Sequence, residues 1–155
     1  MIRSRACIYL LIALIAVPPI AAQTPERLDE LLEQDALDRG AAAYIAAASG
    51  EAVDPAASDE AALEALVNRG FPADRAGQPE ATARLDEFAY MSMLAHEMSG
   101  GFMYALLPGP RYAYRELRHE GIFARGGNPA TEVSGAYALR IVGRVLSIVE
   151  ARQAQ

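Results

Sequence analysis

ALEALVNRGFPADRAGQPEATARLDEFAYMSML, residues 62–94, follows the same pattern as YAYRELRHEGIFARGGNPATEVSGAYALRIVGRVL, residues 112–146. In each stretch a short helical segment ends at a glycine followed by an apolar residue, a proline-containing loop comes next, and a longer apolar helix follows. The sequence therefore predicts two copies of a helix-loop-helix unit, at residues 58–100 and 108–150, which form one domain together with residues 23–57.

A shift of 51 residues aligns the copies: Leu66 with Leu117, Gly70 with Gly121, Phe71 with Ile122 and Leu94 with Val145. Capping residues and helical spacing of apolar residues predict six helices, at about residues 25–35, 39–49, 58–69, 83–99, 111–120 and from 135 onward. We expect the last helix to be the central core helix and residues 73–81 to be a loop. Because no alternating strand pattern occurs, the predicted fold class is all-α.

The order of these elements resembles the S-layer homology domain, across roughly residues 58–149. That resemblance implies repeats packed as a helical pseudo-trimer that holds a protein to cell-wall polymer. It also implies that the arginine of a Thr-Arg-Ala-Glu element faces the ligand groove. Arg84 matches this arginine, Arg39 is a further candidate for it, and Gly135 stands there in the last copy. The family's early tryptophan is absent.

The N-terminus has the features of a secretory signal peptide over residues 1–22. Arg3 and Arg5 precede an apolar run, residues 6–17, and the small residue Ala22 stands at a cleavage position before Gln23. The run is too short for a permanent membrane span. We therefore expect a periplasmic or secreted protein with no transmembrane anchor after cleavage.

Charge and cysteine content exclude several classes of function. The chain has 14 Lys and Arg against 20 Asp and Glu, so nucleic acid is not expected as a partner. Residues 101–155 are nevertheless net basic, with seven Arg against four Glu, whereas residues 23–100 carry 16 acidic residues against five Arg. The single cysteine, Cys7, lies within the predicted signal peptide, so the mature chain has no thiolate nucleophile and no disulfide.

His96 and Glu97 resemble the start of a zinc-protease HExxH element, but position 100 is glycine. The other histidine, His119, supplies no second ligand one helical turn away, so we predict no metal site. No nucleophile-elbow, P-loop or dinucleotide-binding pattern occurs, and we predict neither a cofactor nor catalytic residues. The carboxylate pair Asp86 and Glu87 is interpreted as helix capping.

One segment favours binding. Arg111, Arg115 and Arg118 follow the spacing i, i+4, i+7 and therefore share one helical face. With Tyr112 and Tyr114 beside them, and with Arg84 from the resemblance, they form the predicted binding residues for carboxylates or phosphates. The alternative is a solvated face that pairs with the protein's own acidic residues, such as Glu116 and Glu120, and this alternative is favoured.

Residues 102–107, FMYALL, are too apolar for an ordinary exposed loop. We expect them to cover the core, with an exposed docking patch as the alternative. The leading functional hypothesis is an exported, non-enzymatic domain that binds cell-wall polymer or an envelope protein. The alternatives are an envelope hydrolase that uses His96 and Glu97 as an acid–base pair and a structural subunit of a membrane-associated complex. The sequence leaves the oligomeric state open.

Overall fold

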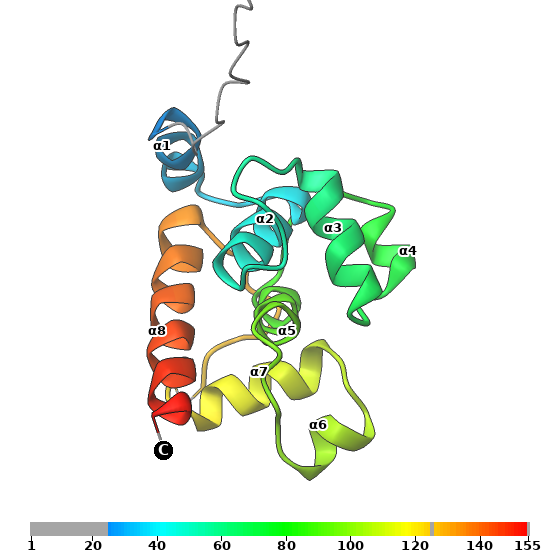
Figure 1. Cartoon of the computed structure of the whole chain (residues 1–155), viewed down its shortest axis with the longest axis vertical. Helices are drawn as coiled ribbons and strands as arrows, with labels where there is room; N and C mark the ends of the chain where they lie inside the picture. The colour runs from blue at the N-terminus through cyan, green and yellow to red at the C-terminus, as the bar shows by residue number, and fades with distance from the viewer. Residues whose placement is uncertain (1–24, 125, 155) are drawn as a thin grey trace, which may run out of the picture.

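A computed structural model describes residues 25–124 and 126–154, and the predicted signal peptide lies outside these ranges. The described part is all-α, as predicted, with eight helices and no strand (Figure 1). The helices are α1 (Pro25–Glu33), α2 (Arg39–Ser49), α3 (Asp59–Asn68), α4 (Ala73–Ala76), α5 (Leu85–Ala95), α6 (Phe102–Leu106), α7 (Pro110–His119) and α8 (Gly135–Gln153). Across the described ranges, none of these helices has the length and hydropathy of a membrane span.

Three buried residues close a ring of backbone hydrogen bonds at the centre of the fold. The Leu37 N–H donates to the Val133 carbonyl (2.8 Å), Val133 to Ala83 (3.2 Å) and Ala83 to Leu37 (2.9 Å). Each residue immediately precedes the N-cap of a helix, and the three helices are α2, α5 and α8. The first residues of these three helices therefore lie close together.

A second set of hydrogen bonds links the same three helices in the opposite cyclic direction. The first-turn N–H groups of the three helices have no partner within their own helix. Arg39 of α2 donates to the Ala81 carbonyl before α5 (2.8 Å), and Leu85 of α5 donates to the Thr131 carbonyl before α8 (2.8 Å). Gly135 of α8 donates to the Gln34 carbonyl before α2 (3.0 Å), so each helix start is bound to the segment that leads into the next.

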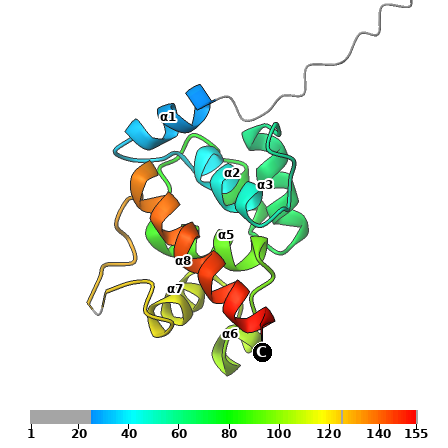
Figure 2. The ribbon, with the colours of Figure 1, turned by 60° about the vertical axis from the view of Figure 1, so that its left-hand side comes forward.

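The central helix is α5, not α8 as predicted. Ten of the eleven residues of α5 are buried, and α5 packs against α2, α3, α7 and α8. On α8 a single stripe is buried, formed by Gly135, Ala138, Ile141, Val142 and Val145. Figures 1 and 2 show α8 along one side of the molecule, which leaves its other apolar residues at the edge of the core.

The predicted ends of two helices and one predicted loop differ from the structure. The first helix ends at Glu33 and not near Asp35, and the predicted loop 73–81 contains the short helix α4. The fourth helix ends at Ala95 and not at Ser99, because Glu97 adopts a left-handed conformation (φ 49°). At this end a Cβ on Gly50 would lie 2.5 Å from the Ala95 carbonyl oxygen, so glycine allows α2 to approach α5.

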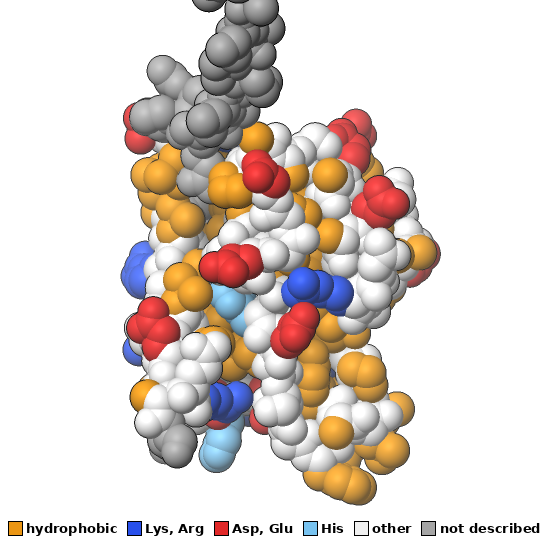
Figure 3. Space-filling view, in the orientation of Figure 1, with side chains coloured by type: hydrophobic (Ala, Val, Ile, Leu, Met, Phe, Trp, Pro, Cys, Tyr) orange, Lys and Arg blue, Asp and Glu red, His pale blue; other side chains and the backbone are white. Residues whose placement is uncertain are grey.

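The prediction that residues 102–107 cover the core is wrong. They form the short helix α6 and its C-cap, and Tyr104 is the one buried side chain of α6. A helix of five residues turns few side chains toward the body of the protein, and the glycines and prolines around it prevent its extension. Figure 3 shows hydrophobic side chains exposed over α6.

Candidate functional site

Helix α7 presents the predicted arginine face to solvent. Ala113, Tyr114 and Leu117 are buried, whereas Arg111, Arg115 and Arg118 are exposed. Within the described ranges, no carboxylate lies within 4.0 Å of these three guanidinium groups. Glu120 binds Arg152 of α8 instead (2.7 Å). Of the favoured alternative, the solvated face is present, but its pairing with the protein's own acidic residues is not found in this part of the chain.

The structure places Arg84 beside that face. An open depression of about 570 Å³ lies between the start of α5, helix α7 and the loop before α8. We call it the arginine groove, and it is lined by Arg84, Asp86, Arg111, Tyr114, Arg115, Arg118, Gly127 and Pro129. Five of the six predicted binding residues line this groove. The sixth, Tyr112, is half-buried outside it, with its ring centroid 5.9 Å from the Arg115 guanidinium carbon.

The groove carries four arginines and one carboxylate. Asp86 is 8% exposed, and its Oδ2 accepts a hydrogen bond of 2.9 Å from Arg84. The Tyr114 hydroxyl donates to the Gly127 carbonyl (2.8 Å), which fixes the loop that forms the far wall. The unpaired arginines leave the groove strongly cationic. Guanidinium groups in such an arrangement bind carboxylates or phosphates through charge-assisted hydrogen bonds.

Arg84 and Arg39 do not occupy equivalent positions. Arg84 is the N-cap residue of α5, as Asp38 is for α2 and Ser134 for α8. Arg39 is the first residue of its helix, so its equivalents are Leu85 and Gly135. The comparison of Arg39 with Arg84 is therefore shifted by one residue.

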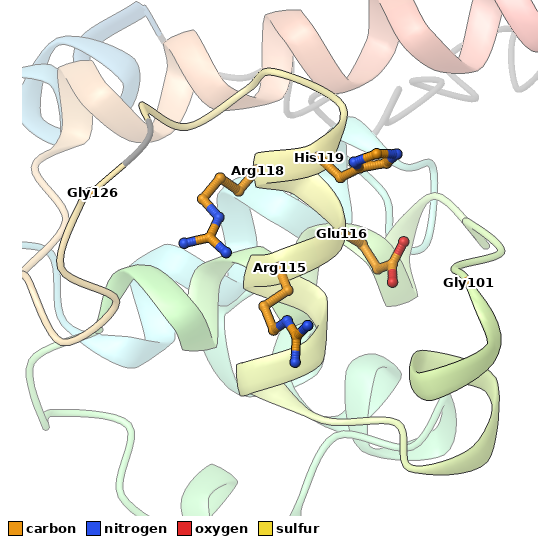
Figure 4. A pocket seen from close by; sticks show the side chains of 6 residues that line it. All are labelled: Gly101, Arg115, Glu116, Arg118, His119 and Gly126. Carbon is orange, nitrogen blue, oxygen red and sulfur yellow. The ribbon is translucent and has the colours of Figure 1, made fainter.

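A second open depression, of about 640 Å³, adjoins the same helix. It is lined by Gly101, Arg115, Glu116, Arg118, His119 and Gly126 (Figure 4). In Figure 4 the Glu116 side chain points toward the Gly101 side of α7, and Arg118 extends toward the Gly126 side. Because Arg115 and Arg118 line both depressions, the cationic surface is broad and open, and it suits an extended anionic molecule.

A buried ionic cluster, which the sequence did not predict, lies next to the groove. The Arg39 guanidinium donates to the carbonyls of Arg75 (2.9 Å) and Gln78 (2.8 Å) and lies 3.3 Å from Glu87 Oε1. Arg75 also binds Glu87, whose side chain is 1% exposed. Glu87 Oε2 accepts the backbone N–H of Arg84 (3.3 Å), so the predicted capping role is real but incomplete. The pairing joins residues 48 positions apart, and no local pattern indicates it.

His96 and Glu97 engage different partners. His96 Nε2 lies 3.2 Å from Ser49 Oγ, and that hydroxyl donates to the Ala46 carbonyl (2.8 Å). The Glu97 side chain is 80% exposed and lies 3.7 Å from Arg69. No group of three or more His, Cys, Asp or Glu that could hold a metal ion occurs in residues 25–124 and 126–154.

Acidification should lower the stability of the protein through the partly buried His96. Burial and the nearby Arg69 charge lower the pKa of His96 from its ordinary value of 6.5. Below about pH 6.5 the unfolded chain therefore takes up a proton that the folded chain resists, and the free energy of unfolding falls. We expect His96→Gln to lose less stability than the wild type between pH 7.5 and pH 5. The difference should be smaller than ~1.4 kcal/mol, the value of one full pKa unit, because the His96 ring is half-exposed.

Urea unfolding at several pH values measures this difference. His119→Gln, at the exposed end of α7, is the matched control, because it removes the other histidine and leaves the surroundings of His96 unchanged. Identical pH dependence of the wild type and His96→Gln would show that His96 titrates alike in the folded and unfolded chains.

Comparisons of the chain with protein-family models, with curated proteins and with solved structures find no match.

Proposed function

We propose that this chain is an exported, non-enzymatic binding domain that holds an anionic envelope component, a cell-wall polymer or an envelope protein, in the arginine groove. The observation that carries the proposal is the meeting of Arg84 with Arg111, Arg115 and Arg118. These residues come from different copies of the proposed helix-loop-helix unit, yet they line one solvent-exposed depression. Four guanidinium groups converge on a groove with a single carboxylate, Asp86, which pairs with Arg84, and this excess of positive charge favours an external anion.

Three features support an S-layer-homology-like arrangement. The ring formed by Leu37, Ala83 and Val133 relates three helices in cyclic order. Both Leu66 and Leu117, which the 51-residue shift aligns, are fully buried. Each is followed by the same turn, because Phe71 donates its N–H to Leu66 and Ile122 donates its N–H to Leu117, both at 2.9 Å.

The arginines and tyrosines have different tasks in this proposal. The Tyr114 hydroxyl is occupied by Gly127, and its ring stacks on Phe123 with 4.9 Å between centroids. Tyr112 lies beside Arg115. The tyrosines therefore position the groove wall and one guanidinium group, while the arginines bind the anion. Multivalent binding along an extended polymer adds the contributions of the separate arginines.

Location outside the cytoplasm is part of the proposal and rests on the N-terminal sequence. The charged start, the apolar run and the small residue before Gln23 are typical of export. The folding of a mature chain without cysteine also does not depend on disulfide formation. N-terminal sequencing of the secreted protein tests the expected cleavage, and recovery of intact Met1-containing protein in membranes would contradict it.

Changing Arg111, Arg115 and Arg118 together to Gln should weaken binding to a purified anionic wall-polymer preparation at least about tenfold, because the groove then loses three of its four cations. The wild-type affinity should also fall with added salt, since exposed charges are screened. Binding isotherms at two ionic strengths measure both effects.

The control changes Arg140, Arg144 and Arg152 of α8 to Gln, which removes the same number of charges from another exposed face. It also removes the Arg152–Glu120 ion pair and the hydrogen bond from Arg144 to the Ile122 carbonyl. Circular dichroism checks that both variants remain helical. Equal affinity of the wild type and the α7 variant, or an equal loss in the control, would overturn the binding role of the arginine groove. Loss of helicity in the α7 variant would show that the arginines stabilise the fold, and a single Arg115→Gln change with intact helicity would then decide the binding role.

A further inference from the structure

Helix α6 carries an exposed group of large apolar side chains. Phe102 is 79% exposed, Leu106 61%, Leu107 53% and Met103 40%, and we call these four residues the apolar tip. In the described ranges the other exposed large apolar residues are Leu28 and Leu32 of α1, a helix at the opposite end of the molecule from α6 (Figure 1). Contiguous exposure of this kind marks an interaction surface.

The packing of Tyr104 holds the apolar tip outward. Phe102, Met103 and Leu106 occupy helical positions i, i+1 and i+4, which lie on one face, while Tyr104 points inward. Leu107 follows as the C-cap residue of α6. Its ring packs edge-on against Tyr90, with 6.3 Å between centroids. A Cβ on Gly100 would lie 2.7 Å from the Tyr104 ring, so the glycine makes room for it. The folded chain thus presents the tip as an anchored element.

The first charged residues after the apolar tip in the chain are cationic. Residues 98–115 contain no Asp or Glu, in a chain of net charge −6. Arg111 lies in the first turn of α7, directly after the short connection from Leu107, and Arg115 follows one turn later. The nearby carboxylate of Glu116 is half-buried, and its Oε1 lies 3.2 Å from the position of a Cβ on Gly101.

We propose that the apolar tip docks on an anionic phospholipid membrane surface, with Phe102, Leu106 and Leu107 in the boundary between headgroups and acyl chains. Arg111 and Arg115 then lie at the level of the lipid phosphates. Proteins bind lipid interfaces through apolar side chains on one face with cationic side chains beside them. Each arginine near an anionic surface adds attraction, which salt screens. Docking through so few side chains is reversible.

The observations favour lipid over protein occupants. A second copy bound tip to tip would bring the Arg111 groups of both copies together, and these like charges repel. A helix that binds a protein groove uses anchors over several turns, at i, i+3, i+4 and i+7, whereas α6 has five residues. A lipid surface needs neither a complementary groove nor a longer helix. The two proposals share Arg111 and Arg115, but the docking alone depends on the apolar tip, whose residues do not line the arginine groove.

The chain has no tryptophan, so a single substitution provides a fluorescent probe of the tip. In the mature protein we expect Phe102→Trp emission to shift to shorter wavelength with vesicles of phosphatidylcholine and phosphatidylglycerol. The shift should be weaker with phosphatidylcholine alone and should decrease with salt. Leu28→Trp, which places the probe at the opposite end, should show no shift. A shift of Leu28→Trp alone, or no shift of Phe102→Trp, would overturn the proposal.

Vesicle sedimentation without a probe tests the same surface. We expect Phe102→Ser combined with Leu106→Ser to reduce binding to anionic vesicles at least about tenfold. Leu28→Ser combined with Leu32→Ser removes two exposed apolar residues elsewhere and should bind like the wild type. Because all four residues are exposed, both variants should fold, and circular dichroism checks this.

Further outcomes separate this proposal from its alternatives. Unchanged vesicle binding by the tip variant would overturn it. If sedimentation equilibrium shows wild-type self-association that the tip variant lacks, while vesicles bind neither protein, a second copy occupies the surface and the lipid proposal fails. The tip variant should retain its affinity for wall polymer, whereas the triple change of Arg111, Arg115 and Arg118 should lose it. Failure of one proposal is therefore visible without failure of the other.

Discussion

Replacing Glu87 by leucine should lower the free energy of unfolding by about 3–5 kcal/mol, the cost of removing one partner from a buried ion pair. Glu87 is 1% exposed and lies against the buried guanidinium of Arg39. Without the carboxylate, that cation keeps two carbonyl partners but loses its countercharge. The backbone N–H of Arg84 also loses its acceptor at the start of α5. Urea unfolding of the wild type and Glu87→Leu measures the difference.

Two comparison variants identify the cause of this loss. Arg75→Gln removes the partly exposed partner of Glu87 and should cost under about 1 kcal/mol, because the Arg39 pairing remains. Combining Arg39→Met with Glu87→Leu removes both buried charges and should be more stable than Glu87→Leu alone. A double variant less stable than that single variant would show that an unpaired Arg39 charge is not the main cost.

The buried cluster also connects the fold to the candidate site. Glu87 binds Arg39 of α2, Arg75 of α4 and the backbone of Arg84, where α5 begins. Arg84 itself lines the arginine groove. The cluster therefore fixes the point on α5 from which the Arg84 side chain extends, and a change at Glu87 should disturb the groove as well as the stability of the domain.

Local sequence predicted the helices whose ends have strong chemical signals. The predicted bounds of α2 agree with the structure because Asp38 accepts a hydrogen bond from the Ala41 N–H (2.7 Å) and Gly50 ends the helix. Ser58 and Ser134 cap α3 and α8 in the same way. These signals act over a few residues, so they can be recognised from the sequence alone.

Burial depended on long-range packing and was predicted less well. α8 is more apolar than its single buried stripe requires, and α5 occupies the centre because it packs against helices from both sides of the chain. For the same reason the exposure of α6 could not be predicted. Helical spacing indicated the arginines of α7, and the family resemblance indicated Arg84. Their meeting in one groove depends on how α5 and α7 pack.

Replacing Leu117 by alanine should cost about 2–5 kcal/mol in the free energy of unfolding, as removal of a fully buried leucine side chain does. Leu117 is 0% exposed and belongs to the buried face of α7, whose main packing partner is α5. Leu66→Ala should cost a similar amount, because Leu66 is equally buried and the 51-residue shift aligns the two positions. Urea unfolding of both variants measures the losses.

Leu107→Ala is the matched control, since the same atoms are removed from a side chain that is already exposed, and it should change stability by less than about 0.5 kcal/mol. A loss in Leu117→Ala no larger than in this control would contradict the burial of α7 against α5. A large loss at Leu117 with a small one at Leu66 would show that the two copies contribute differently to the core. Because Arg115 and Arg118 flank Leu117 on the same helix, a cavity there should also weaken anion binding in the arginine groove, whereas the Leu66 cavity, on α3, should leave that binding unchanged.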